Sequence, residues 1–205
     1  MDTKTCTRCL WVDETKPDYV AYHDDEWGMP VIDDDRLFEF ITLESAQAGL
    51  SWYTILKKRE HYRQAFCQFN VDQVAQMTEQ DVERLMLDSG IVRNRAKILA
   101  TINNAKMFKQ VQAEFGCFAR YQWQFVNYQP QVRHVADKSD YQATSPESDA
   151  FAKDLKKRGF KFLGSTTVYA HMQACGMIND HHNECFKKQA NIDSYADIDF
   201  AALKP

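Results

Sequence analysis

Apolar side chains recur three or four positions apart through most of this 205-residue chain, a spacing typical of amphipathic helices. The clearest stretch is 37–48, in which Leu37, Phe40 and Ile41 share one helical face. The same spacing, together with capping residues, predicts further helices at 52–58, 60–69, 78–88, 91–108, 115–126, 146–158 and 168–175. Residues 127–144 contain turn-forming residues and are expected to form a loop. The pattern therefore predicts an all-α fold.

Capping residues place several of the helix ends. Gly49 suits a C-terminal cap and Ser51 an N-cap, so a tight turn, Gly49-Leu50-Ser51, is expected between the first two helices. The turn would put Leu50 at its tip. Two further helix starts are predicted by a capping box and by a serine followed by a proline, namely Thr78 with Asp81 and Ser145 with Pro146.

One carboxylate interrupts the apolar face of the first helix. Glu44 follows Leu37 and Ile41 at helical spacing, so its side chain is expected to be buried. A buried charge without a partner costs several kcal/mol, so such a carboxylate is paired, protonated or lines a cavity. Glu44 is therefore a candidate site residue, unless the face is misplaced by one step and Glu44 lies on the helix surface.

The turn after this helix supplies two more candidates, Leu50 and Trp52. The arrangement would bring one glutamate and one large indole to the same cavity, with Leu50 beside it. Each candidate has a structural alternative. Leu50 and Ile55 occupy the N′ and N4 positions of a hydrophobic staple, and a tryptophan such as Trp52 is more often a core residue.

Composition limits the class of protein. With 44% apolar residues the chain can bury a core as one domain or two small lobes, and one unit is predicted for 1–187 with a C-terminal tail at 188–205. The tail is expected to be a short acidic and aliphatic appendage. Because no apolar run reaches the roughly 18 residues of a membrane span and the first residues show no secretory segment, a cytoplasmic location is expected. The protein is also expected to be a monomer. The 6 cysteines favour reduced thiols or metal binding over disulfides.

The net charge of −4 gives no global indication of a nucleic-acid partner, but positive charge gathers locally. The stretch 156–167 joins two predicted helices and combines basic residues, glycines and hydroxyl residues: Lys156, Lys157, Arg158, Gly159, Lys161, Gly164, Ser165, Thr166 and Thr167. Glycines let a backbone approach a phosphate closely, and the N–H groups of a helix's first turn point toward it. The stretch predicts a phosphate-binding hairpin; the alternative is two packed helices with a solvated basic end.

Cysteine and histidine occur near both ends of the chain. His181 and Cys185 are four positions apart, so on one helical turn both side chains would face a single metal. With Cys9 and His23 they would complete a Cys2His2 set that joins the two ends and leaves no open position for a catalytic water. Zinc is the leading choice for this set, with a structural role. Two other residues compete for ligand positions, Cys6 and His182.

Taken together, several segments resemble a known family. They are CLWV, YVAYHDDEWG, LFEFITLESAQAGLSWYTILKKRE, SGIVRNRAKI, FVNYQPQV, LKKRGFKFLGSTTVYAHMQACGMINDH and the His181-x3-Cys185 pair. From about Cys9 to Cys185 the chain resembles the bacterial 3-methyladenine DNA glycosylases of type I, which are members of the helix-hairpin-helix DNA glycosylase superfamily. It departs from them at Leu10, where a glycine is frequent, and at Cys6, which adds a Cys-x2-Cys pair.

The resemblance implies a fold and a set of roles. The fold would consist of two helical lobes, with a zinc bound by Cys9, His23, His181 and Cys185 joining the chain ends. Glu44 would contact the exocyclic amine and ring edge of a flipped base, and Tyr22 and Trp52 would hold that base. Leu50 would fill the gap left in the duplex. The DNA-binding residues implied in this way are Leu50, Gly159, Lys161, Gly164, Ser165 and Thr166.

The implied activity is hydrolytic release of N3-methylated adenine from double-stranded alkylated DNA, which leaves an abasic site. Asp180 is the nearest candidate for the activating aspartate of the superfamily, but the resemblance to this family implies that Asp180 is structural. One alternative is a non-catalytic, zinc-containing helix-hairpin-helix DNA-binding protein, which would have no need of a buried Glu44. A zinc nucleobase deaminase would require a Pro-Cys-x-x-Cys motif, which the sequence lacks.

Overall fold

The structure, a computed structural model, describes residues 6–204, and its regular secondary structure consists almost entirely of helices, as predicted. Its α-helices are α1 (Pro17–Asp25), α2 (Asp34–Gln47), α3 (Trp52–Leu56), α4 (Arg59–Ala65), α5 (Val71–Ala75), α6 (Glu79–Leu87), α7 (Arg95–Phe115), α8 (Phe118–Trp123), α9 (Pro146–Lys157), α10 (Ser165–Ala174) and α11 (Phe186–Ser194). Short 3-10 helices are η1 (Cys67–Phe69), η2 (Gln124–Val126), η3 (Lys138–Asp140), η4 (Tyr195–Asp197) and η5 (Phe200–Leu203). Within residues 6–204, no helix combines the length and the hydropathy needed to cross a membrane.

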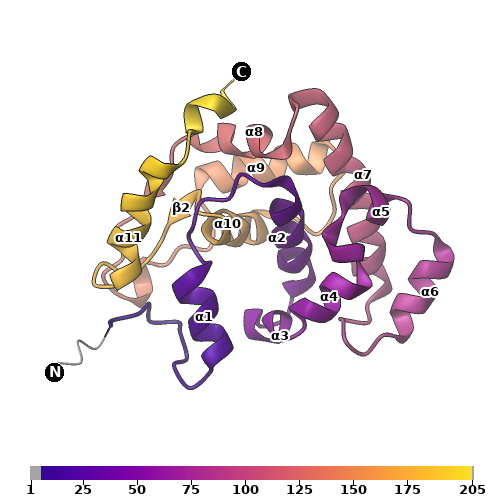
Figure 1. Cartoon of the computed structure of the whole chain (residues 1–205), viewed down its shortest axis with the longest axis horizontal. Coiled ribbons are helices and arrows are strands. Elements are labelled where there is room, and N and C mark those ends of the chain that lie inside the picture. Colours follow the sequence, from indigo (N-terminus) through magenta and orange to yellow (C-terminus); the bar gives the residue numbers. More distant parts are fainter. Residues whose placement is uncertain (1–5, 205) are drawn as a thin grey trace.

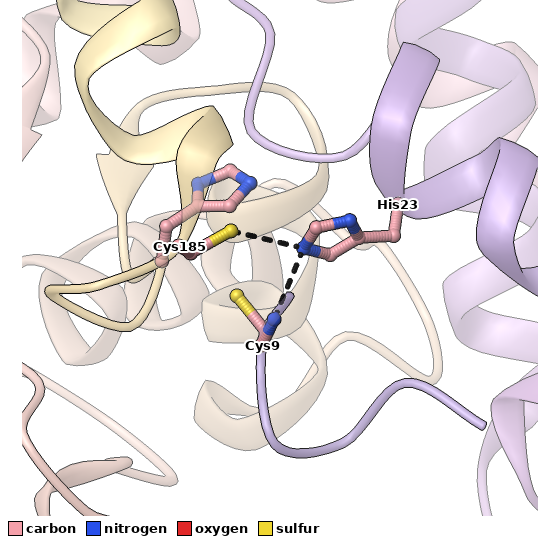
Figure 2. Close-up of side chains that lie close together, drawn as sticks. Cys9, His23 and Cys185 are labelled. Carbon is pink, nitrogen blue, oxygen red and sulfur yellow. Dashed lines mark hydrogen bonds between the residues drawn. The ribbon is translucent and has the colours of Figure 1, made fainter. Parts of the chain in front are cut away.

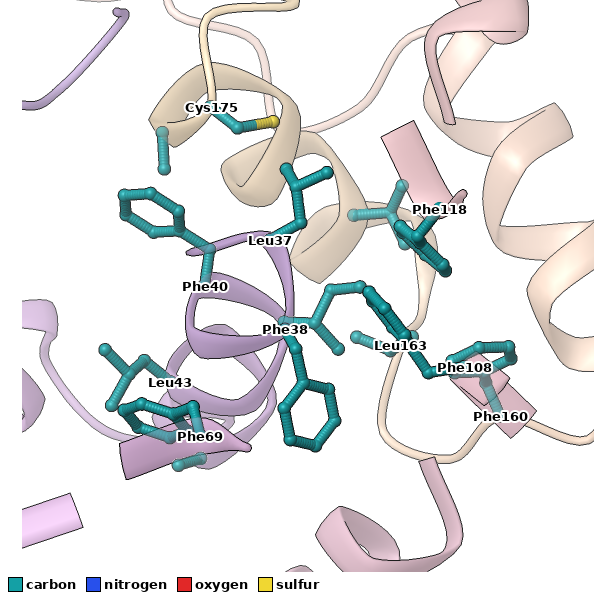
Figure 3. Close-up of a cluster of buried hydrophobic side chains, with 14 of the residues drawn as sticks. Leu37, Phe38, Phe40, Leu43, Phe69, Phe108, Phe118, Phe160, Leu163 and Cys175 are labelled. Atoms are coloured by element: carbon teal, nitrogen blue, oxygen red, sulfur yellow. The ribbon is translucent and has the colours of Figure 1, made fainter. Parts of the chain in front are cut away.

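Helix α2 is the central element of the fold. It lies between α10 and α4 in Figure 1, and it also packs against α3, α7 and α8. Every residue from Leu37 to Ala46 is buried. Phe38 packs edge-on against Phe108 of α7, with ring centroids 5.4 Å apart, inside the apolar cluster drawn in Figure 3. Helices from both halves of the chain therefore share one core around α2.

This burial corrects the single apolar face predicted for 37–48. Neighbouring helices surround α2, so polar positions such as Glu39 and Glu44 are buried along with the apolar ones. Glu44 is 4% exposed, which excludes the alternative in which it lies on the helix surface. Its expected burial is confirmed, although the buried surface of α2 is wider than the apolar face from which that burial was predicted.

The predicted caps around the first turn are confirmed. Gly49 has a φ of +78°, the left-handed conformation that glycine adopts easily after a helix. The Ser51 hydroxyl accepts a hydrogen bond from the Thr54 N–H at 3.3 Å and starts α3. Further on, the Thr78 N–H donates to the Asp81 carboxylate at 2.9 Å, as a capping box requires.

The helix predicted at 60–69 is wrong at its C-terminal end. Helix α4 stops at Ala65, and Cys67, Gln68 and Phe69 follow with φ values of 54°, 55° and 58°. Consecutive left-handed residues break the helical hydrogen-bond pattern. The break directs Phe69 into the core, where it is 2% exposed.

Three other predicted helices have different ends. The helix predicted at 91–108 is α7, which begins later because Asn94 is its N-cap and then continues to Phe115. Gly116, with a φ of +86°, separates α7 from α8, so 115–126 is not one helix. Helix α10 begins at Ser165 rather than 168 because Gly164 takes the N-cap position.

The loop expected at 127–144 contains one side of a small sheet. Strand β1 (Gln131–Val132) runs parallel to β2 (Ile178–Asn179), with Gln131 opposite Ile178. The pairing holds this loop against the segment that leads to His181. The fold is therefore all-α apart from one two-residue pair of strands within the described residues.

The tail after residue 187 packs against the helical body instead of forming the appendage expected from the sequence. The rings of Phe200 and Trp123 lie 4.7 Å apart, and Leu203 is 9% exposed. The Tyr195 hydroxyl accepts a hydrogen bond from Asn179 Nδ2 at 3.0 Å. The tail thus contacts the strand that precedes His181, while the two-lobed division of 1–187 stays a prediction.

Gly176 is expected to be the glycine most sensitive to substitution. It follows α10 with a φ of +73°, and an added Cβ would lie 2.4 Å from the backbone nitrogen of Pro30. We expect Gly176→Ala to lower the free energy of unfolding by more than about 3 kcal/mol in urea denaturation, because strained φ and backbone overlap add. Gly164→Ala is the control, because a Cβ there meets nothing within 4 Å. Equal losses in both variants would contradict this packing.

Candidate active site and candidate metal centre

A cavity of about 270 Å³ lies among the N-terminal segment, α1, α2, α3 and α10. Its wall consists mainly of aromatic rings and amides with one carboxylate: Trp11, Tyr19, Tyr22, Trp27, Glu44, Gln47, Trp52, Tyr141, Gln142, Ala170 and Gln173. Such a size and lining suit a flat organic ring. The structure thus brings three of the predicted site residues, Tyr22, Glu44 and Trp52, to one cavity.

Glu44 is the carboxylate of this wall. Its Oε2 is buried and has no hydrogen-bond partner among residues 6–204. Burial raises the pKa of the carboxyl from 4.5 to about 8. A buried, unpaired carboxyl ionises readily once a cation or hydrogen-bond donors enter the cavity. The position of Glu44 therefore suits an electron-poor or positively charged ligand.

Tyr22 and Trp52 extend the wall from α1 and α3. Their ring centroids are 5.2 Å apart and their planes are inclined by 45°. Burial, followed by the charge of Glu44, raises the pKa of the Tyr22 phenol well above its ordinary value. The Trp52 indole N–H is buried and makes no hydrogen bond within the described part of the chain. The two rings therefore offer aromatic surface and an available donor next to Glu44.

The pKa of Glu44 predicts how stability depends on pH. The folded protein keeps the proton up to about pH 8, whereas the unfolded chain releases it near pH 4.5, so the free energy of unfolding falls as pH rises through this interval. Glu44→Gln removes this contribution and is expected to be more stable than the wild type near pH 8, by on the order of 3 kcal/mol. Urea denaturation of both proteins at pH 5 and pH 8 checks this. Parallel pH dependences would mean that Glu44 is not buried and unpaired.

A second, smaller hollow adjoins the cavity. It has a volume of about 170 Å³ and is lined by Glu44, Gln47, Ala48, Gly49, Leu50, Thr166, Thr167 and Ala170. Leu50 is 41% exposed, so a large part of its surface is open to solvent at the tip of the turn. The predicted Leu50 turn and the first turn of α10 thus lie at one opening.

The connection between α9 and α10 is anchored to α7 by two asparagines. Asn103 Nδ2 donates to the Gly159 carbonyl at 2.9 Å, and the Asn104 side chain bonds both the N–H and the carbonyl of Lys161, at 2.8 and 3.0 Å. Gly159 has a φ of +96°. The connection is held in place by these bonds while its outer residues stay exposed, among them Lys161, Gly164 and Thr166.

Two side chains of the predicted basic hairpin bind other residues of the protein. Arg158 pairs with Asp154 at 2.6 Å and with Glu114 at 2.7 Å. The Ser165 hydroxyl lies 2.8 Å from the Ser148 hydroxyl of α9. These contacts fix the two helices to each other and to α7. They occupy the side chains of Arg158 and Ser165 and leave the backbone of Ser165, the exposed lysines, Gly164 and Thr166 available to a ligand.

Cys9, His23, His181 and Cys185 meet in the interior, and their ligand atoms all lie within 4.8 Å of one another. Figure 2 shows Cys9, His23 and Cys185 converging from separate segments, with His23 Nε2 3.5 Å from the Cys185 sulfur. The structure therefore brings together the four residues predicted from both ends of the chain.

The hydrogen bonds of the two histidines suit a metal between them. His23 Nδ1 lies 2.7 Å from the Asp24 carboxylate and His181 Nδ1 lies 3.0 Å from Asn179 Oδ1, so each ring leaves its Nε2 for the cluster. The Nε2 of His181 is buried without a partner among the described residues, and burial lowers the His181 pKa to about 3. Two thiols and two such imidazoles are a tetrahedral donor set for a divalent metal, so the residues fit.

The local geometry of the cluster differs from the prediction. His181 and Cys185 do not share a helical turn, because α11 begins only at Phe186. The two side chains converge because the non-helical segment between them folds back on itself. The competing residues face elsewhere: Cys6 is exposed, and His182 Nε2 lies 2.7 Å from the Ala136 carbonyl.

Several lining residues were missed by the sequence prediction. Trp11 and Trp27 line the cavity and also contact the Cys/His cluster, with the Trp11 ring 5.3 Å from the His23 ring and the Trp27 ring 4.5 Å from the His181 ring. The available signal was the density of aromatic residues in 6–28, a segment without helical spacing. The cluster therefore supports one wall of the cavity.

Comparisons with known proteins show which family the chain resembles. The family model described as methyladenine glycosylase matches residues 11–188. DNA-3-methyladenine glycosylase 1 of Escherichia coli (strain K12) is 52% identical over 178 residues, which cover 87% of this chain and 95% of that protein. A crystal structure of 3-methyladenine DNA glycosylase I superposes with a TM-score of 0.85 at 51% identity, covering 88% of this chain and 98% of that chain. The Staphylococcus aureus 3-methyladenine DNA glycosylase I, solved to explain 3-methyladenine recognition, gives 0.82 at 41% identity, covering 84% and 92%.

The fold is thus that of a base-excising glycosylase. The chain belongs to the methyladenine glycosylase family.

Proposed function

We propose that the protein flips N3-methylated adenine out of alkylated double-stranded DNA and hydrolyses its glycosidic bond, leaving an abasic site. The observation that carries the proposal is the buried, unpaired carboxyl of Glu44 inside an aromatic cavity next to Tyr22 and Trp52. Its family membership supports the same activity.

The chemistry of the substrate explains why these residues suffice. Adenine methylated at N3 in DNA is cationic, so its glycosidic bond is already weakened and the departing base needs little acid assistance. An ionised Glu44 attracts the cation, and the rings of Tyr22 and Trp52 add cation–π terms of about 0.5 to 2 kcal/mol each. Glu44 accepts hydrogen bonds from the N–H groups at the edge of the base. Water is the nucleophile that attacks the sugar carbon. Unmethylated adenine carries no charge and gains none of these charge-dependent terms.

We propose that DNA lies across the opening formed by the Leu50 turn and the first turn of α10. Leu50 would fill the space left by the flipped base, which offsets part of the few kcal/mol that flipping costs. Gly159, Lys161, Gly164, Ser165 and Thr166 would form a helix-hairpin-helix phosphate site, with the exposed Lys161 and the free N–H groups of α10 facing one strand.

Leu50→Ala is expected to weaken binding to duplex DNA that contains an abasic-site analogue by about 10-fold, because the gap in the duplex is then left unfilled. Fluorescence anisotropy measures this. Thermal stability should be unchanged, since Leu50 is 41% exposed. Leu87→Ala is the control, because Leu87 is 82% exposed on α6 and does not line the opening. Equal affinities for wild type and Leu50→Ala would show that Leu50 does not contribute to DNA binding.

We further propose that Cys9, His23, His181 and Cys185 hold one structural zinc. The metal would supply no chemistry to the reaction, because four protein ligands leave no coordination position for water. These four residues would join the start of the chain to the segment before α11 and keep Trp11 and Trp27 in the cavity wall.

The experiment that tests the proposed function is incubation of the protein with methylated duplex DNA, followed by mass spectrometry of the released bases. Selective release of 3-methyladenine is expected. Intact DNA binding without any released base would favour a non-catalytic DNA-binding protein with the same hairpin.

A further inference from the structure

Gln173 of α10 lines the cavity and is held from behind by Asp180. Its Nε2 donates to Asp180 Oδ2 at 2.8 Å, and the Tyr169 hydroxyl donates to the same oxygen at 2.6 Å. Asp180 is 2% exposed and does not line the cavity. Asp180 is therefore in a position to act on a ligand only through Gln173.

This hydrogen bond decides which way the Gln173 amide faces. A carboxylate accepts hydrogen bonds and donates none, so the NH2 group of Gln173 has to point toward Asp180. The amide oxygen of Gln173 is then the end left for the cavity. Among the described residues, no hydrogen bond to that oxygen is present. The cavity thus contains a fixed acceptor in addition to Glu44.

We propose that Gln173, oriented by Asp180, makes the cavity prefer methylated adenine over methylated guanine. The inference rests on the proposed function and names a determinant of its base selectivity. At position 6 adenine carries an amine, which donates, whereas guanine carries a carbonyl oxygen, which accepts. Two acceptors facing that edge pair with the amine and repel the carbonyl. Asp180 is a positioning residue in this arrangement and takes no part in breaking the glycosidic bond.

Gln173→Met tests the proposal directly, because methionine has a similar shape and no amide. The assay measures release of 3-methyladenine and 3-methylguanine from the same duplex DNA treated with a methylating agent. The ratio of the two bases is expected to fall at least about fivefold, since the guanine carbonyl no longer meets the amide oxygen. A ratio equal to that of the wild type, or equal losses of both bases, would overturn the proposal.

Two further variants separate orientation from general damage. Tyr169→Phe removes the other hydrogen bond to the same Asp180 oxygen and leaves Gln173 held, so its base ratio should stay within about twofold of the wild type. Asp180→Leu removes the acceptor that orients Gln173 and should lower the ratio, whereas Asp180→Asn keeps an oxygen acceptor there and should restore it. A wild-type ratio in Asp180→Leu would contradict the role of Asp180. If the wild type releases neither base, the proposed function fails instead.

We also infer that the C-terminal segment holds the metal cluster in place through Tyr195. Asn179 is fully buried and its side chain is saturated: Oδ1 accepts from the His181 backbone N–H and lies 3.0 Å from His181 Nδ1, while Nδ2 donates to the Lys188 carbonyl at 3.2 Å and to the Tyr195 hydroxyl at 3.0 Å. Tyr195 lies beyond residues 11–188, the part that matches the family. It fixes the amide that orients a metal ligand.

Tyr195→Phe tests this role without removing the aromatic ring. We expect zinc to pass from the purified variant to a chromogenic chelator at least about threefold faster than from the wild type. The reason is that removing a hydrogen-bond partner of a metal ligand commonly lowers the metal affinity by about tenfold or more. Tyr62→Phe on α4 is the matched control, since its hydroxyl also accepts one hydrogen bond, from the Val92 N–H. Equal release rates in wild type and Tyr195→Phe would overturn the inference. A wild-type protein without metal would contradict the proposed zinc site itself.

Discussion

Replacing Glu44 by glutamine is expected to lower the rate of 3-methyladenine release from methylated duplex DNA by on the order of 100-fold. The buried carboxylate supplies the negative charge that favours a cationic base, and an amide of the same shape does not. Because the glutamine side chain still fills the site, the variant should fold normally. The substitution should lower only the rate of base release. Single-turnover release, followed by mass spectrometry, gives the rate constant directly.

Asp180→Asn is the control for this variant, because it neutralises a second buried carboxylate close to the cavity. Asp180 is bonded to Tyr169 and Gln173 and does not line the cavity, so its loss of charge should lower base release far less than the Glu44 variant does. The reverse order would assign the active carboxylate to Asp180. Binding of both variants to undamaged duplex DNA should match the wild type, since neither residue is exposed.

Replacing Cys9 by serine is expected to remove the proposed zinc and much of the stability together. Loss of one thiolate from a set of four breaks the link between the start of the chain and the segment 181–185, and metal sites of this type contribute folding energy directly. We expect the melting temperature to fall by about 10 °C or more and the zinc content to fall in parallel. Calorimetry and elemental analysis of the same sample measure both.

Cys6→Ser is the matched control for this variant. Cys6 is exposed and lies outside the cluster, so its substitution should leave the zinc content and the melting temperature at the wild-type level. One zinc per chain in Cys9→Ser, together with a loss in Cys6→Ser, would assign the ligand position to Cys6 instead.

The parts of the site that are encoded locally could be predicted from the sequence. Glu44 stands at helical spacing from Leu37 and Ile41, and Gly49 and Ser51 mark the turn that follows, so their placement depends on short-range rules. Each of these features is found in the structure. Helical periodicity and capping chemistry were sufficient to place Glu44 and the turn that follows its helix.

Other parts depend on contacts between distant segments, which spacing does not encode. Trp11, Tyr141 and Gln173 come from three separate regions and become neighbours only when the helices pack. The left-handed turn at Cys67–Phe69 contains no glycine, so the sequence did not indicate positive φ values there. The burial of α2 on all sides likewise follows from the helices around it.

The Cys/His cluster shows a third case, in which the residues were predicted to converge but the local geometry was not predicted. His181 and Cys185 were placed on a helical turn because their spacing allows it, whereas the segment is non-helical and the ligands meet through tertiary packing. The chemistry of the side chains was a better guide than the secondary structure assigned to them.

We propose that the cavity of Glu44, Tyr22 and Trp52 binds the methylated base. The most direct measurement is a titration of 3-methyladenine into protein labelled with ¹⁵N at its tryptophans, followed by the indole N–H signals in NMR spectra. The signal of Trp52 should shift with base concentration, and those of Trp11 and Trp27 should shift to a smaller extent. Trp123 does not line the cavity, and its indole N–H donates to the Val31 carbonyl at 3.0 Å. Its signal should therefore stay in place. An unmoved Trp52 signal in the presence of saturating base would contradict the assignment of this cavity.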